Sequence, residues 1–286
     1  MTDLANYSNI RAVLERNGFN FKKSLGQNFL INPTVCPRMA DAAVKSCDFG
    51  VLEIGPGVGV LTAELAQRAS KVVSIEIDRR LQPVLAETMA DYDNVKIIFD
   101  DFMRLDAAAL ISNEFGGMPV AVCANLPYYI TSPIIMRLLE SRLPIDNITV
   151  MVQKEAADRL CAAPGTRQCG AVSVAVGYYS QPKVLFQVSR GSFMPPPNVD
   201  SSVIQLSVLG RPPVKVSDEK GFFTFIKASF STRRKTLSNA VGGVIGCSKA
   251  EFAELLGSLG IPSQVRAEQL TLEQFAAIYN RLNEEK

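Results

Sequence analysis

A chain of 286 residues that is 47% hydrophobic and 20% charged has room for one large domain and a small second one, and this composition argues against wholesale disorder. Its net charge is only +2, so any contact with nucleic acid must come from a local basic surface. The chain contains 0 histidines, which removes Ser-His and Cys-His catalysis together with the commonest metal ligand.

The cysteines and the N-terminal residues indicate in which cellular compartment the protein is expected. The 6 cysteines are widely scattered and form no C-x-x-C pair, which predicts reduced thiols without a disulfide framework or a zinc site. No basic stretch followed by an apolar one opens the chain, and no run of 18 apolar residues occurs. We therefore expect a cytoplasmic protein that is neither secreted nor membrane-spanning.

The N-terminal region predicts a helix followed by a basic loop. Apolar residues at helical spacing within residues 1–20 indicate a short amphipathic helix. Residues 21–33 are polar, basic and aromatic, and they are expected to lead into a helix that begins near Pro33. Lys22 and Lys23 in this loop are candidates for phosphate contacts, although a solvated pair is the commoner role for such lysines.

A glycine-rich turn follows the first predicted strand. Residues 51–54 form a short apolar strand that runs into Gly55-Pro56-Gly57-Val58-Gly59, and a helix is expected to begin near Leu61. Strand, glycine turn and helix are typical of the nucleotide-binding start of a doubly wound fold, because glycine lets the backbone approach a ligand. The spacing differs from the G-x-G-x-x-G of dinucleotide sites, so no pyrophosphate need be held there.

Acidic residues follow the next two predicted strands. The second strand ends in Glu76 and Asp78, where an acid can accept both ribose hydroxyls of an adenosine. Glu76 is the first candidate and Asp78 the second. A third strand over residues 95–99 precedes Asp100 and Asp101, where a carboxylate could accept the N6 amine of a cofactor adenine. The alternative for this acidic pair is helix capping, because a helix is expected soon afterwards.

The most informative stretch follows a fourth strand over residues 120–124. It reads Asn125-Leu126-Pro127-Tyr128-Tyr129, and ligands of open α/β sheets bind at the carboxyl ends of strands. The Asn125 amide and the Leu126 main-chain carbonyl offer two acceptors, which Pro127 helps to hold in place. Tyr128 offers a flat face for stacking. This combination suits an exocyclic amine on a planar ring; the alternative is an ordinary turn at the end of a strand.

The rest of the first domain contains a rigid proline segment. Phe193 precedes Pro195-Pro196-Pro197, which must be extended and stiff, so Phe193 could form the second face of a base-binding sandwich. The alternative is a rigid linker. The other predicted segments are a strand at 148–152, a loop at 162–170, a helix or strand at 172–179 and at 183–188, and a last strand at 202–208.

The sequence predicts two domains, of residues 1–209 and 210–286. The boundary falls at a Gly-Arg-Pro-Pro sequence, and beyond it the apolar pattern is helical and predicts about three to five helices. Arg233, Arg234 and Lys235 lie in a stretch without acidic residues and form a candidate RNA-binding surface. A solvated helix face is the alternative.

Seven motifs in chain order resemble the ribosomal RNA adenine N6,N6-dimethyltransferase family, most closely its bacterial small-subunit members. Each motif is only moderately specific, but seven in the family's order over nearly the whole chain are very specific. The motifs are Leu25–Leu30, Glu53–Gly59, Ile75–Asp78, Asn125–Tyr129, Gln153–Glu155, Pro195–Ser201 and Arg233–Leu237.

The resemblance implies a Rossmann-like class I methyltransferase sheet with a small all-helical C-terminal domain. It also implies S-adenosyl-L-methionine as methyl donor, no metal, and the N6 atoms of two adjacent adenines near the 3′ end of 16S rRNA as acceptors. The small ribosomal subunit would be the partner, with a role in its biogenesis, and we expect a monomer.

The resemblance assigns roles by motif. The implied cofactor positions are Asn28 and Leu30 at the methionine end, Gly55 and Gly57 at the backbone approach, Glu76 at the ribose, Asp101 at the adenine, and Asn125 between donor and target. The implied catalytic positions are Asn125, Leu126, Pro127, Tyr128 and Phe193. The family usually has Gly-Asp where this chain has Asp100-Asp101, which leaves the choice of acid open.

Other functions share parts of this pattern. A large-subunit rRNA adenine dimethyltransferase that confers antibiotic resistance would use the same chemistry, but the proline-rich motif and Arg233–Leu237 favour the small-subunit substrate. A DNA adenine methyltransferase would share Asn-x-Pro-Tyr without the other motifs. The chain could also be a ribosome-assembly or nucleic-acid-binding factor whose methyl transfer is secondary, or a small-molecule methyltransferase.

Overall fold

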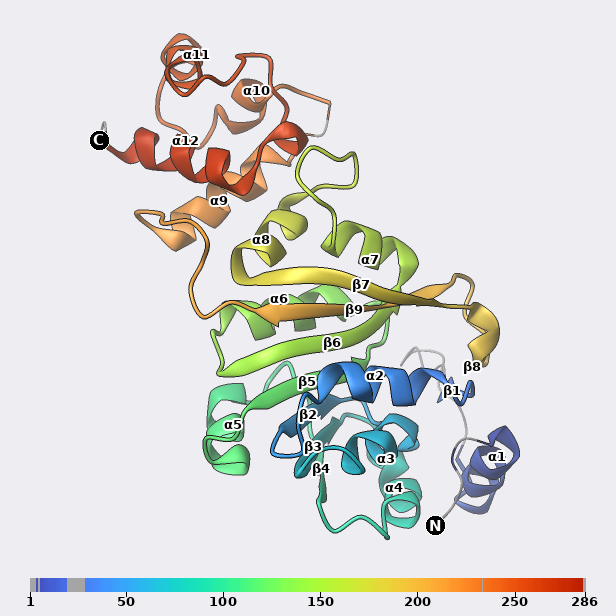
Figure 1. Cartoon of the computed structure of the whole chain (residues 1–286). Coiled ribbons are helices and arrows are strands. Elements are labelled where there is room, and N and C mark those ends of the chain that lie inside the picture. The colour runs from blue at the N-terminus through green and yellow to red at the C-terminus, as the bar shows by residue number, and fades with distance from the viewer. Residues whose placement is uncertain (1–3, 5, 20–28, 233, 285–286) are drawn as a thin grey trace. The chain divides into compact units, whose positions relative to one another are not determined.

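Seven strands form the central sheet of the protein, for which a computed structural model describes residues 4, 6–19, 29–232 and 234–284 (Figure 1). In spatial order they are β4 (Val95–Phe99), β3 (Lys71–Glu76), β2 (Gly50–Ile54), β5 (Val120–Asn125), β6 (Ile145–Gln153), β9 (Ser201–Val208) and β7 (Ser180–Val188). The strands from β4 to β6 are parallel, and β9 runs antiparallel to β6. This arrangement confirms the predicted α/β class with a mostly parallel sheet.

The parallel strands are short apolar runs because helices cover the sheet. All residues of β2 are buried, and so are the residues of β5 before Asn125. The helices of this part of the chain are α1 (Tyr7–Arg16), α2 (Val35–Ala43), α3 (Val60–Ala66), α4 (Gln82–Thr88), α5 (Ala107–Phe115), α6 (Thr131–Glu140) and α7 (Lys154–Leu160). The predicted N-terminal helix is therefore present, and its apolar face packs against α4.

Side-chain amides of the sheet fix the position of α2. Asn147 on β6 is fully buried, and its Nδ2 donates to the Ala43 carbonyl at 2.9 Å. Gln205 on β9 donates from Nε2 to the Ala42 carbonyl at 2.6 Å. These bonds satisfy carbonyls that the C-terminal end of a helix leaves without partners. The helix is thereby held against the sheet while its other residues line the pocket described below.

A second, two-stranded sheet joins segments that are far apart in the sequence. Strand β1 (Phe29–Leu30) pairs antiparallel with β8 (Phe193–Met194), so that Leu30 lies opposite Phe193. The Ile31 N–H donates to the Ser192 carbonyl at 2.8 Å, just beyond this pairing. Phe29 and Leu30, which fall within the loop predicted near the N-terminus, therefore pair with the two residues that directly precede the proline segment.

The chain divides into two compact units, of which the first comprises residues 1–157 and 183–208 and the second residues 158–182 and 209–286. The second unit contains α8 (Ala171–Tyr179), α9 (Glu219–Ser229), α10 (Leu237–Val241), α11 (Lys249–Ser258) and α12 (Leu272–Glu284). Tyr179 stacks on Phe223 of α9 and donates from its hydroxyl to Glu219 at 2.6 Å. These contacts add residues 158–182 to the second unit; the boundary after residue 209 stays a prediction of domain organisation.

The two segments that the sequence predicted as either helix or strand differ in secondary structure. Residues 172–179 belong to helix α8, whereas 183–188 belong to strand β7. Across the described ranges, no helix is both long and apolar enough to span a membrane.

Candidate active site at the carboxyl ends of the strands

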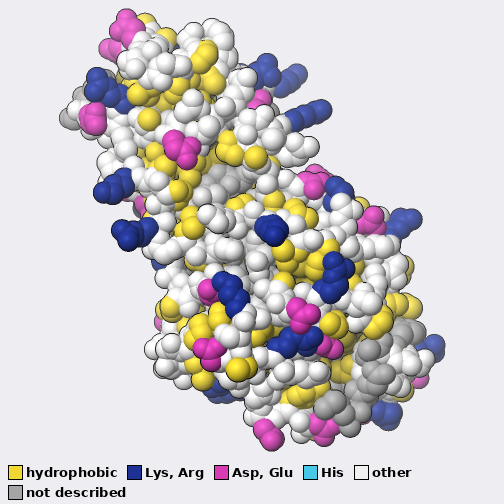
Figure 2. Space-filling view, in the orientation of Figure 1, with side chains coloured by type: hydrophobic (Ala, Val, Ile, Leu, Met, Phe, Trp, Pro, Cys, Tyr) yellow, Lys and Arg dark blue, Asp and Glu magenta, His cyan; other side chains and the backbone are white. Residues whose placement is uncertain are grey.

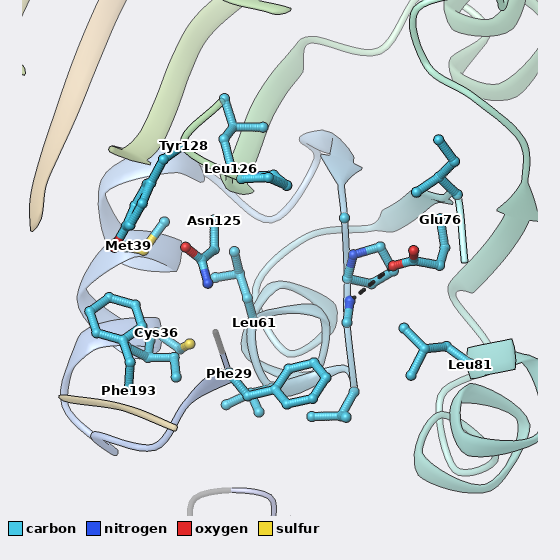
Figure 3. Close-up of a pocket in the computed structure, with 18 of the residues that line it drawn as sticks. Phe29, Cys36, Met39, Leu61, Glu76, Leu81, Asn125, Leu126, Tyr128 and Phe193 are labelled. Atoms are coloured by element: carbon cyan, nitrogen blue, oxygen red, sulfur yellow. Dashed lines mark hydrogen bonds between the residues drawn. The ribbon is translucent and has the colours of Figure 1, made fainter. Parts of the chain in front are cut away.

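A pocket in the first unit lies where β2, β3 and β5 end (Figure 3). It gathers predicted site residues from five separate stretches of the sequence, as expected for the carboxyl edge of a parallel sheet. The predicted residues that line it are Leu30, Gly55, Gly57, Glu76, Asn125, Leu126, Pro127, Tyr128 and Phe193. The convergence supports a single ligand-binding site.

The glycine turn forms one wall of the pocket and requires its glycines. Gly57 has φ +60°, and a Cβ added there would lie 3.1 Å from the Phe29 ring. Gly59 has φ +92°, and a Cβ there would lie 2.6 Å from the Met89 methyl group. Other residues rarely adopt such φ values. Of these two glycines, Gly57 lines the pocket and exposes its backbone there. This shape fits the close approach of a nucleoside-type cofactor.

Glu76 ends β3 and faces the same space. Its Oε1 accepts the Asp78 N–H at 2.7 Å, and its Oε2 accepts the Gly57 N–H at 3.3 Å, the bond drawn in Figure 3. Burial raises the pKa of this carboxyl group above its usual value. The Asp78 carboxylate instead bonds Arg80, with Oδ2 at 2.5 Å from Nη2, and is not among the lining residues. Of the two candidate acids, Glu76 is the one that lines the pocket.

Asp100 and Asp101 make local contacts outside this lining. Asp101 Oδ1 accepts the Met103 N–H at 2.9 Å, and its Oδ2 lies 3.5 Å from Arg104 Nε. Asp100 Oδ1 accepts the Asp101 N–H at 2.7 Å. These are turn contacts of the kind that the capping alternative describes, although helix α5 itself is capped by Asp106. The assignment of Asp101 to a cofactor adenine stays a prediction.

Asn125 is the last residue of β5 and points into the centre of the pocket. Figure 3 shows its amide between Glu76 on one side and Tyr128 with Phe193 on the other. Within the described residues, this amide makes no hydrogen bond to another group of the protein. The turn after it is fixed, because the Pro127 carbonyl accepts both the Ile130 N–H at 3.2 Å and the Thr131 hydroxyl at 3.3 Å. A rigid acceptor is thus presented to the pocket.

Aromatic side chains flank Asn125. Tyr128 is partly buried, and its hydroxyl lies 2.8 Å from the Ser201 hydroxyl; burial raises its pKa. Phe193 is buried, whereas Tyr129, which also lines the pocket, is 63% exposed. The two rings expected to sandwich a base are therefore present in one pocket.

The structure describes only some of the predicted RNA-binding residues. Outside the described residues lie Lys22, Lys23 and Arg233, together with Asn28 of the predicted cofactor site. Arg234 and Lys235 are exposed in the second unit between α9 and α10, and the Lys235 N–H donates to the Thr232 carbonyl. Figure 2 shows basic side chains that project from this unit, and acidic and basic side chains are interspersed over both units.

Sequence reasoning missed several pocket residues. Cys36 and Met39 reach the pocket from α2, and no sequence signal identified them. Ile77 lines the pocket and is 55% exposed; an apolar residue between two acids at a strand end was a usable signal. Within the described part of the chain, no group of three His, Cys, Asp or Glu side chains is placed to hold a metal ion.

Glu53 was also missed as a single residue, although its motif was noticed. It is fully buried on β2, one residue away from the start of the glycine turn. Its Oε2 accepts the Thr62 hydroxyl of α3 at 2.7 Å and the Ser74 hydroxyl of β3 at 2.6 Å. Its Oε1 has no partner within the described residues. Burial without a cation raises the pKa of Glu53 to about 7.

We expect this carboxyl group to make stability depend on pH. Because the folded-state pKa of about 7 lies above the ordinary 4.5, the folded chain holds an extra proton between these values. The stabilisation is fully present below pH 4.5 and is lost as the pH rises through 7, on the order of 3 kcal/mol in total. The Glu53→Gln variant has no such group to ionise. The free energy of unfolding should therefore decrease with rising pH in the wild type more than it does in the variant.

Urea titrations of both proteins from pH 4.5 to 8 measure the difference. Glu140→Gln, a substitution on an exposed part of α6, is the matched control and should follow the wild type. Parallel curves for wild type and Glu53→Gln would show that Glu53 is ionised throughout this range.

Comparison with known proteins gives matches over nearly the whole chain. A family model described as "Ribosomal RNA adenine dimethylase" matches residues 18–284. The "Ribosomal RNA small subunit methyltransferase A" of Geobacillus sp. (strain WCH70) is 48% identical over 284 residues, which cover 98% of each chain. The protein of the same name from Bacillus mycoides (strain KBAB4) is 45% identical over 286 residues, which cover 99% of this chain and 98% of the relative.

Solved structures give the same picture. A dimethyladenosine transferase from Plasmodium falciparum has a TM-score of 0.75 at 25% identity, covering 90% of this chain and 98% of that one. The 23S rRNA methyltransferase ErmE has a TM-score of 0.71 at 26% identity, covering 90% of this chain and 100% of its own. The similarity thus extends across the residues that build the pocket.

Proposed function

The chain belongs to the ribosomal RNA adenine dimethylase family, and we propose that it dimethylates N6 of two adjacent adenines near the 3′ end of 16S rRNA. Membership makes it an S-adenosylmethionine-dependent rRNA adenine dimethyltransferase. The observation that carries the proposal is the pocket itself, which joins a glycine turn and an acid to an amide flanked by aromatic rings.

The cofactor half of the pocket fits S-adenosylmethionine. The glycine turn leaves room that a Cβ would fill, and Glu76 offers a carboxylate to the ribose hydroxyls. Leu30 from β1 would border the methionine end. When bound, S-adenosylmethionine supplies an electrophilic methyl group. The roles of Asn28 and Asp101 are proposed from their motifs alone.

The substrate half of the pocket fits an unstacked adenine. Tyr128 and Phe193 would clamp the base between their rings, and stacking of this kind contributes about 1–3 kcal/mol per base. The target base must leave its stack to enter, which favours single-stranded or flipped adenines. Pro127 keeps the turn rigid so that the acceptors and the clamp hold one geometry.

Asn125 and Leu126 would activate the acceptor nitrogen. The N6 amine is a poor nucleophile because its lone pair is delocalised into the ring. The Asn125 Oδ1 and the Leu126 carbonyl can accept its two hydrogens, which favours a more tetrahedral nitrogen and localises the lone pair. The rate gain would come from positioning and electrostatics, without a covalent intermediate. After transfer N6 is acidic, and its proton can leave to solvent, so no histidine base is needed.

Recognition of the ribosomal particle would use local basic residues. We propose that Lys22, Lys23, Arg233, Arg234 and Lys235 contact phosphates of the small subunit. Such contacts should make binding strongly dependent on salt, because each neutralised phosphate releases counterions. We further propose that the protein acts as a monomer in the cytoplasm, during biogenesis of the small subunit.

Labelled methyl transfer tests this function directly. The purified protein is incubated with labelled S-adenosylmethionine and small ribosomal subunits that lack the modification, and methylated positions are read by mass spectrometry. Two adjacent N6,N6-dimethyladenosines near the 16S 3′ end are expected. Incorporation into large-subunit RNA alone would favour the resistance-type substrate. Tight subunit binding without incorporation would favour an assembly factor.

A further inference from the structure

Ser201 holds a position from which it can orient the base-stacking ring. It begins β9, where it lies opposite Gln153 of β6, and it is fully buried. Its hydroxyl oxygen lies 2.8 Å from the Tyr128 hydroxyl oxygen. Within the described residues, Tyr128 is the only side-chain hydrogen-bond partner of this serine. A side chain on a turn is thereby tied to a strand of the central sheet.

The bond matters because the Tyr128 ring could otherwise swing out of the pocket. Tyr128 follows Pro127 on a turn and is partly exposed, so packing alone encloses only part of its ring. A hydrogen bond at the far end of the ring restricts rotation about the first side-chain torsion, which moves the hydroxyl, and so fixes where the ring lies. A site built on a strand is also held more precisely than one built on a loop. The strand thus fixes the position of the ring on which a base would stack.

Asp200, the residue before Ser201, contacts the segment that leads into Phe193 on the other side of the pocket. The Asp200 Oδ1 accepts the Arg190 N–H at 2.9 Å, at the start of the short 3-10 turn η3 (Arg190–Ser192) that leads into Phe193. The Asp200 carbonyl accepts the Lys154 N–H at 3.0 Å at the end of β6. The start of β9 therefore contacts the segments that carry both aromatic rings.

We propose that Ser201 is a positioning residue for base capture, which acts through the Tyr128 hydroxyl and holds the Tyr128 ring in the place where the target adenine stacks. The proposal rests on the proposed function and adds to it a residue outside the substrate-contacting set. It requires that the two hydroxyls act as one unit, so that removing either one has the effect of removing both.

Methyl-transfer kinetics on small subunits lacking the modification test this coupling. Ser201→Ala and Tyr128→Phe should each lower kcat/KM for subunits by about three- to tenfold, the loss of one hydrogen bond. The double variant should fall no more than about twofold below either single variant. The Kd for S-adenosylmethionine should stay within about twofold, which a general loss of structure would not allow. Ser202→Ala is the matched control, because this buried neighbour faces the other side of the sheet.

A spectroscopic measurement keeps the test independent of activity. In protein labelled with ¹³C-tyrosine, the Tyr128 ring signals are identified by their absence from a Tyr128→Leu spectrum. They should shift in Ser201→Ala and stay in place in Ser202→Ala. Losses that multiply in the double variant, wild-type kinetics for Ser201→Ala, or an unshifted Tyr128 signal would each overturn the proposal. Wild-type protein that leaves subunits unmethylated would refute the proposed function instead, while the ring signals still decide the role of Ser201.

Discussion

Asn125→Ala is expected to lower the rate of methyl transfer about 100- to 1,000-fold, the usual effect of removing one preorganised group that stabilises a transition state. The amide lies in the centre of the pocket, between Glu76 and the aromatic pair. Since it makes no hydrogen bond within the described residues, its removal should leave the surrounding structure in place. The loss should therefore appear in kcat, with the affinity for S-adenosylmethionine largely retained.

Single-turnover rates on small subunits and calorimetric titration of the cofactor separate the two effects. Asn113→Ala replaces an exposed asparagine of α5 in the same unit and should behave as wild type. Asn125→Asp keeps the size and an acceptor oxygen, and should retain more activity than the alanine variant. Near-wild-type turnover of Asn125→Ala would remove this residue from the mechanism. Complementation with the same variant distinguishes an enzyme from an assembly factor, because the latter would still support growth.

The central sheet was predictable because its signals are local. Parallel strands buried on both faces are short apolar runs, and residues 51–54 and 120–124 matched β2 and β5 to within a residue. Residues 95–99 matched β4, an edge strand that is only partly buried but is also mostly apolar. The glycine turn was predictable for the same reason, since its φ values depend on residue type. Once the strands are parallel, their carboxyl ends must share one edge, so the convergence of the site follows from the topology.

The parts that the sequence did not predict depend on contacts between distant segments. Strands β1 and β8 have two residues each, too few for any periodicity, and they exist because they pair with each other. Helix α8 is buried on nearly every side, so it lacks the polar face that distinguishes a helix from a strand. The alignment of Ser201 with Tyr128 likewise joins residues that are 73 positions apart.

The second large effect is expected at Glu76, whose replacement by alanine should weaken S-adenosylmethionine binding by at least about 100-fold. Two hydrogen bonds from ribose hydroxyls to a carboxylate are lost, and hydrogen bonds to charged groups contribute about 1.5–3 kcal/mol each. Glu76 also accepts the Gly57 N–H, so its loss would loosen the glycine turn as well. Both effects act on the cofactor half of the pocket, and a saturating cofactor concentration should restore part of the rate.

Calorimetric titration of the Glu76→Ala and Asp78→Ala variants with S-adenosylmethionine shows which of these two acids binds the ribose. The Asp78 carboxylate bonds Arg80 and caps the short turn η2 (Arg79–Leu81), so Asp78→Ala should lower thermal stability and leave the cofactor Kd within about threefold. Weak binding by Asp78→Ala with normal binding by Glu76→Ala would transfer the ribose contact to Asp78. Such a result would require the turn to rearrange around the bound cofactor, because the Asp78 carboxylate does not line the pocket described here.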